Sequence, residues 1–248
     1  MTFIEYIRYL LLLLFFPRSL KTMEWRMLRF LNKDRKKNRL LPLRMQDDLR
    51  DVARKHSKDM ARKDYFEHVN MKGQSPADRL NIARVTEVTS GENLAKIGGF
   101  GNPTQFAEEG LMNSPGHRAN ILNPAYNVVG IGIIQDLRKI YYFTQNFAKR
   151  DIIFRRRPTA AVKLSKSLRL HGEINRDVTS VICQIHYPGQ EKPVSQKIVK
   201  IKKTYFDEQI FFPEIGLFDI WLFCEHHHDG RFSLSNKFGV RVKKGFFS

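Results

Sequence analysis

The sequence contains little cysteine and no long apolar run. Two cysteines in 248 residues cannot build a disulfide framework, nor can they build a four-cysteine zinc site. A transmembrane helix needs about 20 apolar residues, whereas the run near the N-terminus, Tyr9–Phe16, is much shorter. Glycine and proline are scattered, and no repeat of solenoid period is present. These absences exclude disulfide-rich, collagen-like and repeat proteins, and they leave an ordinary globular composition.

Acidic residues are also in deficit, and the deficit is uneven along the chain. The formal charge is +18, with 43 Lys and Arg against 25 Asp and Glu. Net charges of +8, +3 and +7 fall on residues 1–45, 46–150 and 151–248. No nucleic-acid-binding motif accompanies this charge, so we do not expect a nucleic acid as partner. The basic excess instead favours an anionic membrane or envelope surface.

The first 26 residues form a basic segment around the apolar run Tyr9–Phe16. The length of this run fits the apolar region of a secretory signal, which has about 7–15 residues. Glu5 and the lack of a small-x-small cleavage site fit less well, so an interfacial anchor is the alternative, and an apolar helix packed on its own domain is a third. We predict that residues 1–26 are a signal or membrane anchor, which places the protein outside the cell or at its surface.

The middle of the chain reads as helices followed by strands, an α+β arrangement. Helical spacing from Gln46 predicts one buried face, formed by Leu49, Val52, Ala53, His56 and Met60. Ser75 and Pro76 suit the start of a short helix, and a further helix is expected over Thr104–Met112. The β-branched and aromatic runs Asn127–Ile134 and Ile140–Phe147 predict two strands.

After the polar junction at Arg155–Pro158, the sequence contains only short strand-like runs. They are Leu168–Ile174, Thr179–Tyr187, Gln196–Ile201, Gln209–Phe212, Leu217–Cys224 and Phe238–Val242. Turn residues separate them at hairpin spacing. We therefore predict that residues 158–248 form an all-β, immunoglobulin-like sandwich.

Three polar residues flanked by apolar ones are candidates for a site. His68 ends the first long helical segment, Glu92 lies in a Gly-Glu-Asn cluster, and His117 follows a Pro-Gly turn. Imidazoles with a supporting carboxylate suit zinc and similar metals. The gaps of about 24 residues match no local metal motif, and each histidine taken alone also fits a structural, hydrogen-bonded role.

Six stretches carry a resemblance to a known family. They are HSKDMARKDYFEH (His56–His68), NMKGQSPADRL (Asn70–Leu80), GENLA (Gly91–Ala95), MNSPGHRANILNP (Met112–Pro124), VGIG (Val129–Gly132) and YFTQNF (Tyr142–Phe147). In this order they resemble the CAP superfamily, also called SCP domains, in the prokaryotic branch that lacks disulfides. The resemblance runs from about Met27 to Phe147. It implies a three-layer α-β-α sandwich for a domain that we place at residues 27–150.

The resemblance also implies a cavity described by two His and two Glu. His68, Glu92 and His117 match three of these positions, and Ser114 stands where the second Glu is expected. The prokaryotic branch commonly shows this loss. Leu111 departs from the pattern as well, because tryptophan is usual there. In several family members the two histidines bind a divalent metal, often zinc, so His68 and His117 are the expected metal ligands here.

These residues predict a secreted or surface-anchored CAP-domain protein whose His68–Glu92–Ser114–His117 cavity binds a divalent metal or a small ligand. Lipid and sterol binding is known for eukaryotic relatives. The β-sandwich is expected to act as an accessory domain for envelope or partner interaction. The alternative is a metal-dependent hydrolase of peptide or cell-wall material with His68, Glu92 and His117 as its catalytic candidates. The missing carboxylate weakens it, because a general acid/base pair cannot be assembled from these positions.

Other polar residues receive structural interpretations. We expect His56 to be a hydrogen-bonded core histidine, and Glu108 and Glu109 to lie on a solvated helix face. Successive strand residues alternate faces, so the run His226–His228 is more consistent with an exposed turn than with a metal cluster. The sequence leaves a disulfide and two buried free thiols as equal alternatives for the two cysteines.

Overall fold

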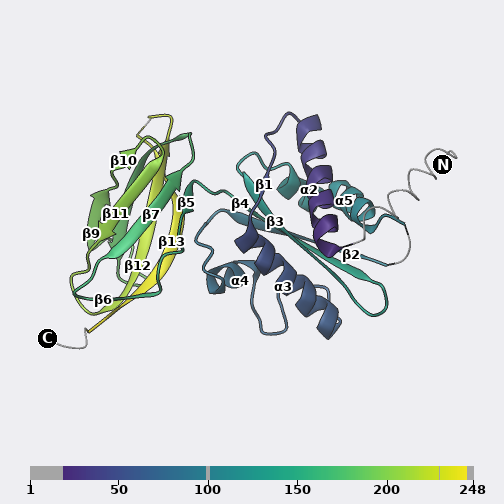
Figure 1. Cartoon of the computed structure of the whole chain (residues 1–248), viewed down its shortest axis with the longest axis horizontal. Helices are drawn as coiled ribbons and strands as arrows, with labels where there is room; N and C mark the ends of the chain where they lie inside the picture. Colours follow the sequence, from purple (N-terminus) through teal and green to yellow (C-terminus); the bar gives the residue numbers. More distant parts are fainter. Residues whose placement is uncertain (1–18, 99–100, 229, 245–248) are drawn as a thin grey trace. The chain divides into compact units, whose positions relative to one another are not determined.

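The computed structural model describes residues 19–98, 101–228 and 230–244, which form two compact units (Figure 1). Within these residues, the first unit comprises 19–83 and 90–147, and the second comprises 84–89 and 148–244. The apolar run Tyr9–Phe16 lies outside the described residues. No helix in the described ranges is long and apolar enough to cross a membrane.

The first unit mixes helices with one four-stranded sheet. Its elements are α2 Leu20–Lys37, β1 Arg44–Met45, α3 Asp47–Lys63, α4 Pro76–Ile82, β2 Ser90–Ile97, α5 Pro103–Asn113, α6 Pro115–Ile121, β3 Val128–Gln135 and β4 Tyr141–Ala148. The sheet order is β1-β3-β4-β2. Helices α2 and α5 cover one face of the sheet, and α3 and α4 lie on the other (Figure 1). The expected three-layer α-β-α sandwich is therefore confirmed.

Strand alternation explains the two faces of the sheet. Val129, Ile131 and Ile133 point to one side, where they share a core with α2 and α5. Between them, Gly130 and Gly132 face α3, and a Cβ on either would lie 2.1–2.2 Å from the helix backbone. The two glycines of the VGIG stretch thus let α3 approach the sheet more closely than any side chain would allow.

The predicted helices are present, but α3 ends at Lys63, so His68 lies in the loop after the helix and not at its end. The predicted face of α3 is buried, His56 included. Ser75 caps α4 in a capping box with Asp78, and Pro76 occupies the first turn. Two elements differ from the sequence prediction, because β2 covers the Gly-Glu-Asn cluster that we read as polar, and α2 begins at Leu20 within the segment assigned to a signal or anchor. Met23 is buried in the core, which ties this part of α2 to the first unit.

The second unit is an all-β sandwich, as predicted. Its strands are β5 Ile152–Phe154, β6 Ala161–Lys163, β7 Leu168–Ile174, β8 Val178–His186, β9 Ser195–Ile198, β10 Ile201–Lys202, β11 Tyr205–Ile210, β12 Gly216–His226 and β13 Phe232–Lys243. A four-stranded sheet, β10-β11-β7-β5, and a five-stranded sheet, β6-β13-β12-β8-β9, enclose one apolar core.

The boundaries of this unit differ from those we placed from sequence. Strand β5 precedes the polar junction and lies between the domains that we placed at 27–150 and 158–248, and it pairs with β7 of the sandwich. Residues 84–89 also belong to this unit, because the Glu87 carboxylate pairs with Arg150 and the Thr86 hydroxyl accepts from Asn236. This segment is far from the rest of the sandwich in sequence, so its β-branched residues alone did not show which unit it joins.

The two cysteines are free thiols, which resolves the alternative left open by the sequence. Cys183 lies on β8 and Cys224 on β12, and both are buried in the sandwich core. The paired strands place Leu222 opposite Cys183 and Val181 opposite Cys224, so the two thiols do not face each other. Burial raises the pKa of each thiol to about 12, which keeps both protonated and unreactive.

Candidate functional site

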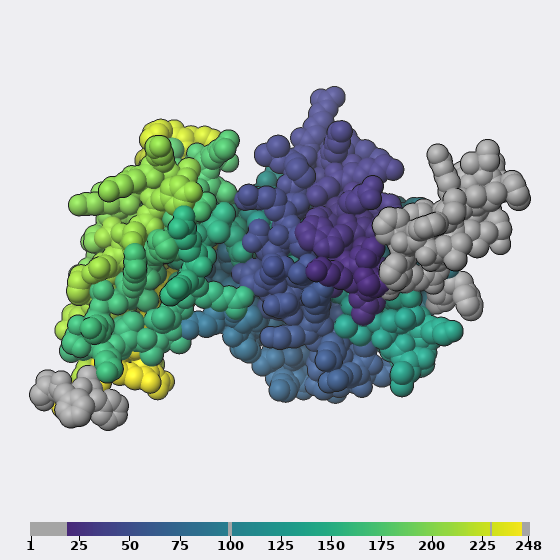
Figure 2. Space-filling view, in the orientation of Figure 1, coloured from purple at the N-terminus to yellow at the C-terminus, as the bar shows by residue number. Residues whose placement is uncertain are grey.

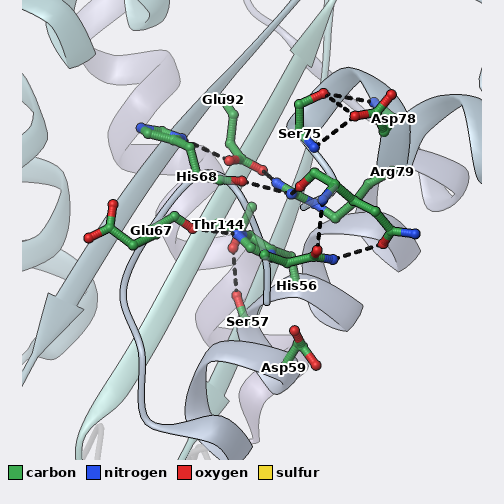
Figure 3. Close-up of polar contacts among 12 residues, drawn as sticks. His56, Ser57, Asp59, Glu67, His68, Ser75, Asp78, Arg79, Glu92 and Thr144 are labelled. Atoms are coloured by element: carbon green, nitrogen blue, oxygen red, sulfur yellow. Dashed lines mark hydrogen bonds and ion pairs between the residues drawn. The ribbon is translucent and has the colours of Figure 1, made fainter. Parts of the chain in front are cut away.

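Glu92 is the centre of the site in the first unit. It lies near the start of β2, and its side chain is 2% exposed. A histidine and an arginine contact its carboxylate (Figure 3). His68 Nδ1 lies 2.8 Å from Oε1, and the guanidinium of Arg79 donates to Oε2 at 2.6 Å. A buried carboxylate is stable as an anion only when it is paired in this way.

Arg79 is the site residue that our sequence prediction missed. It lies on α4, and one guanidinium nitrogen donates to the backbone carbonyls of His68 (2.7 Å) and Gln74 (2.8 Å) (Figure 3). The same side chain therefore fixes both the loop that carries His68 and the carboxylate that His68 contacts. The sequence feature that could have indicated Arg79 is its position in the SPADRL stretch, directly after the capping box that begins α4.

A network of amides connects β2 to His117. Asn120 of α6 donates to the Asn93 side-chain oxygen at 2.9 Å, and Asn93 in turn donates to the backbone carbonyl of His117 at 3.0 Å. Gly91 leaves room for this network, since a Cβ there would lie 2.6 Å from the Tyr126 hydroxyl and 2.8 Å from Asn120 Oδ1. The three residues of the Gly-Glu-Asn stretch thus have separate roles. Gly91 lets neighbouring side chains approach the backbone, Glu92 is a buried anion, and Asn93 holds the backbone of His117.

Glu108 extends the same network, contrary to our expectation of a solvated face. Its side chain is buried on α5 and accepts a hydrogen bond of 2.8 Å from Gln145 Nε2, whose oxygen accepts from Asn93. Only Glu109 lies exposed. The helix turns Glu108 toward β4, a placement that depends on tertiary packing rather than on the pattern of α5. Burial raises the pKa of Glu108 to about 8.

The two histidines have opposite pKa shifts. The hydrogen bond that the His68 ring donates to the Glu92 carboxylate raises the pKa of His68, although partial burial opposes it. Partial burial, and then the positive charge of His68, lower the pKa of His117. The charge of His68 thus acts on the ring of His117. His117 therefore favours its neutral form, with a nitrogen lone pair available to a ligand.

Ser114, the fourth residue that we predicted for the site, supplies no charge. It is half-buried and lies at the junction of α5 and α6, where it caps both helices through its backbone conformation. Within residues 19–98, 101–228 and 230–244, no group of three His, Cys, Asp or Glu side chains could hold a metal ion. Both oxygens of the Glu92 carboxylate are engaged, one by His68 and the other by Arg79.

Two other histidine features have separate roles. His56 is a core histidine, as predicted, with its Nε2 3.1 Å from the Glu67 carbonyl. His227 and His228 are exposed and have positive φ angles. The Nε2 atom of His226 lies 3.4 Å from Oδ1 of Asp151.

Replacement of Glu108 by Gln should make stability less dependent on pH. The pKa of Glu108 is raised in the folded state, so its contribution is fully present below the ordinary value near 4.5 and is lost as pH rises through about 8. Between these limits the free energy of unfolding of the native chain should fall by about 1.4 kcal/mol per pH unit relative to that of the variant. Urea unfolding of both chains at pH 5 to 8 measures this, with the exposed Glu109→Gln as control. Parallel stability profiles for Glu108→Gln and the native chain would contradict the prediction.

The fold and these motifs agree with comparisons to known proteins. The family model "CAP: Cysteine-rich secretory protein family" matches residues 28–147. The Bacillus subtilis (strain 168) protein YkwD is 36% identical over 119 residues, or 48% of this chain and 45% of its own length. The membrane protein YlbC of the same organism is 38% identical over 129 residues, or 52% of this chain and 35% of its own length.

A solved structure is similar over about half of the chain. It is an extracellular protein containing an SCP domain from Bacillus anthracis strain Ames, 29% identical, with a TM-score of 0.47; the match covers 54% of this chain and 44% of that one. The chain spans less than half the length of either B. subtilis relative. Residues 28–147 of this chain are therefore a CAP domain of the prokaryotic type, in the cysteine-rich secretory protein family.

Proposed function

We propose that the CAP domain binds a divalent metal, such as zinc, through His68 and His117, on a protein that acts outside the cell or at its surface. The contact that carries this proposal is the 2.8 Å bond between His68 Nδ1 and Glu92 Oε1. A carboxylate on one ring nitrogen fixes the tautomer and directs the other nitrogen, Nε2, toward a ligand. Zinc commonly accepts imidazole ligands in this arrangement.

The pair of imidazoles fits a metal with further ligands from water or from a small molecule. Half of the His68 side chain is exposed, so its free edge is open to solvent. The lowered pKa of His117 keeps a second lone pair available. A bound metal would supply a Lewis acid at this position. The side chains themselves provide binding and orientation, with Arg79 and Asn93 holding the two histidine segments in place.

Binding is favoured over hydrolysis by the state of Glu92. A general base must have an oxygen free to accept a proton from the reacting group, and both Glu92 oxygens are engaged, one by an arginine. Ser114 has no carboxyl group, and the Glu108 carboxyl is directed at Gln145. The alternative of a metal-dependent hydrolase of peptide or cell-wall material would need an acid or base from outside this set.

The proposed location rests on the N-terminal sequence and on the relatives. The apolar run Tyr9–Phe16, which precedes α2 in the sequence, has the length and composition of the apolar part of a signal or interfacial anchor. One relative, YlbC, is described as a membrane protein. In this proposal the β-sandwich is an accessory domain that holds the CAP domain at an anionic envelope surface.

Zinc titration of the full chain tests the metal proposal. We expect one zinc ion per chain by calorimetry and by native mass spectrometry, and we expect His68→Ala/His117→Ala to lose it. The exposed pair His227→Ala/His228→Ala is the matched control and should keep full stoichiometry. The proposal fails if zinc binding survives the first double substitution or disappears with the second.

A further inference from the structure

The outer face of the sheet β10-β11-β7-β5 contains a recess with a volume of about 360 Å³. It lies within the second unit, so it is separate from the histidine site of the CAP domain. The green and yellow-green segments that carry this sheet form much of the surface shown for the second unit in Figure 2. The inner side chains of the same strands, Phe206 among them, belong to the sandwich core.

Strand register explains which side chains meet in the recess. His171 of β7 pairs with Asp207 of β11, and Lys202 of β10 pairs with Tyr205 of β11. The backbone NH of Arg155 bonds to the carbonyl of His171, which brings the arginine beside the same row. Because residues at these positions share the outward face of the sheet, their side chains converge on one patch.

The recess has an excess of positive charge. Arg155, Lys200 and Lys202 line it and are exposed. Arg155 lies 3.8 Å from the Glu173 carboxylate, whereas neither lysine forms an ion pair with any residue in the described part of the chain. The acidic residues at the recess are already neutralised. Asp207 is paired with Arg169, and Glu208 with Lys197. The two lysines therefore have their charge available for an anion.

Tyr205 gives the recess a flat aromatic surface. It is 46% exposed, and the guanidinium of Arg155 lies 5.1 Å from its ring centroid. A cation over the ring fixes the orientation of both groups. An exposed, oriented ring beside free ammonium groups is suited to a ligand that combines a ring with a negative charge.

We propose that this recess binds a phosphorylated sugar unit, either free or as part of an envelope polymer. The lysines contact the phosphate, and the sugar ring packs on Tyr205. The volume lies near the lower end of the range of about 300–1,000 Å³ typical of ligand pockets, so it accommodates about one ring with its substituent. A membrane would need only charge and would not use the ring. This inference rests on the accessory role proposed for the β-sandwich.

Titration of the full chain with glucose 6-phosphate, inorganic phosphate and glucose tests the proposal. NMR or calorimetry should show the strongest binding for glucose 6-phosphate, weaker binding for phosphate and none for glucose. Lys200→Ala/Lys202→Ala should weaken glucose 6-phosphate binding about tenfold or more. Tyr205→Leu, which keeps an apolar side chain on the strand, should remove the preference for the sugar phosphate over phosphate.

The control Lys163→Ala/Lys166→Ala makes the same change in net charge at exposed lysines outside the recess, and it should leave affinity unchanged. His68→Ala/His117→Ala should keep sugar-phosphate binding, which separates this test from that of the metal site. Equal losses in the two lysine variants, or no binding of glucose 6-phosphate, would overturn the proposal. Loss of binding to anionic lipid vesicles, without loss of sugar-phosphate binding, in Lys200→Ala/Lys202→Ala would assign the recess to a membrane instead.

Discussion

Replacement of Arg79 by Met is expected to destabilise the CAP domain by about 3–5 kcal/mol, because it leaves a buried carboxylate without its cation. Arg79 and Glu92 have side chains only 8% and 2% exposed, and they lie 2.6 Å apart. The variant also releases the carbonyls of His68 and Gln74. Urea unfolding, followed by the fluorescence of Trp25 in a Trp221→Phe background, reports on the first unit alone.

Two further variants show whether the cause is the uncompensated charge. The double substitution Arg79→Met/Glu92→Met removes both charges, so it should be more stable than Arg79→Met alone. Arg138→Ala removes an arginine that pairs with Asp64 at the surface, where solvent screens the interaction, and its effect should be much smaller. If Arg79→Met and Arg138→Ala reduce stability equally, Arg79 is an ordinary surface residue and our description of the site is wrong.

Replacement of Gly132 by Ala is expected to lower the free energy of unfolding of the CAP domain by about 3 kcal/mol or more, or to prevent the domain from folding. The added Cβ would lie 2.2 Å from the backbone nitrogen of Arg54 and 2.3 Å from the carbonyl carbon of Ala53. Backbone cannot rotate away as a side chain can, so all of α3 must move from the sheet. His56 lies on the same helix, and the movement would disturb its contact with the His68 loop.

Gly110→Ala is the matched control for this prediction. It lies within α5, and a Cβ there meets nothing within 4 Å. Removing a glycine from a helix interior should stabilise the chain by about 0.5–1 kcal/mol. The thermal unfolding of both variants, again followed at Trp25, gives the comparison. Equal stability of Gly132→Ala and the native chain would show that α3 does not pack as closely as the structure indicates.

Periodic elements of this fold were predictable from the sequence because their patterns are local. The apolar face of α3, the capping box of α4 and the alternating strands of the sandwich each follow from spacing and residue type. The resemblance to the CAP family indicated His68, Glu92 and His117. Contact between His68 and Glu92 could not be derived from spacing, since they are 24 residues apart.

What the sequence did not reveal depends on tertiary contacts. Strand β2 was missed because its first residues are Ser, Gly, Glu and Asn. Of these, Glu92 and Asn93 are buried, which is possible only because hydrogen-bond partners satisfy their side chains. Arg79 is a charged residue on a short helix, and its role depends on the approach of β2. Glu108 was assigned to solvent for the same reason, since only the packing of α5 on the sheet buries it. Burial of a charged group is a property of the assembled fold and has no local signature.

The histidine rings themselves provide the most direct test of the proposed metal site. Long-range ¹H–¹⁵N NMR of the imidazoles during zinc titration distinguishes the two nitrogens of each ring. We predict that zinc shifts Nε2 of His68 while Nδ1 keeps the proton shared with Glu92, and that His117 shifts at the same stoichiometry. If zinc leaves both rings unchanged and shifts only His226–His228 signals, the CAP domain of this chain does not hold a metal at this site.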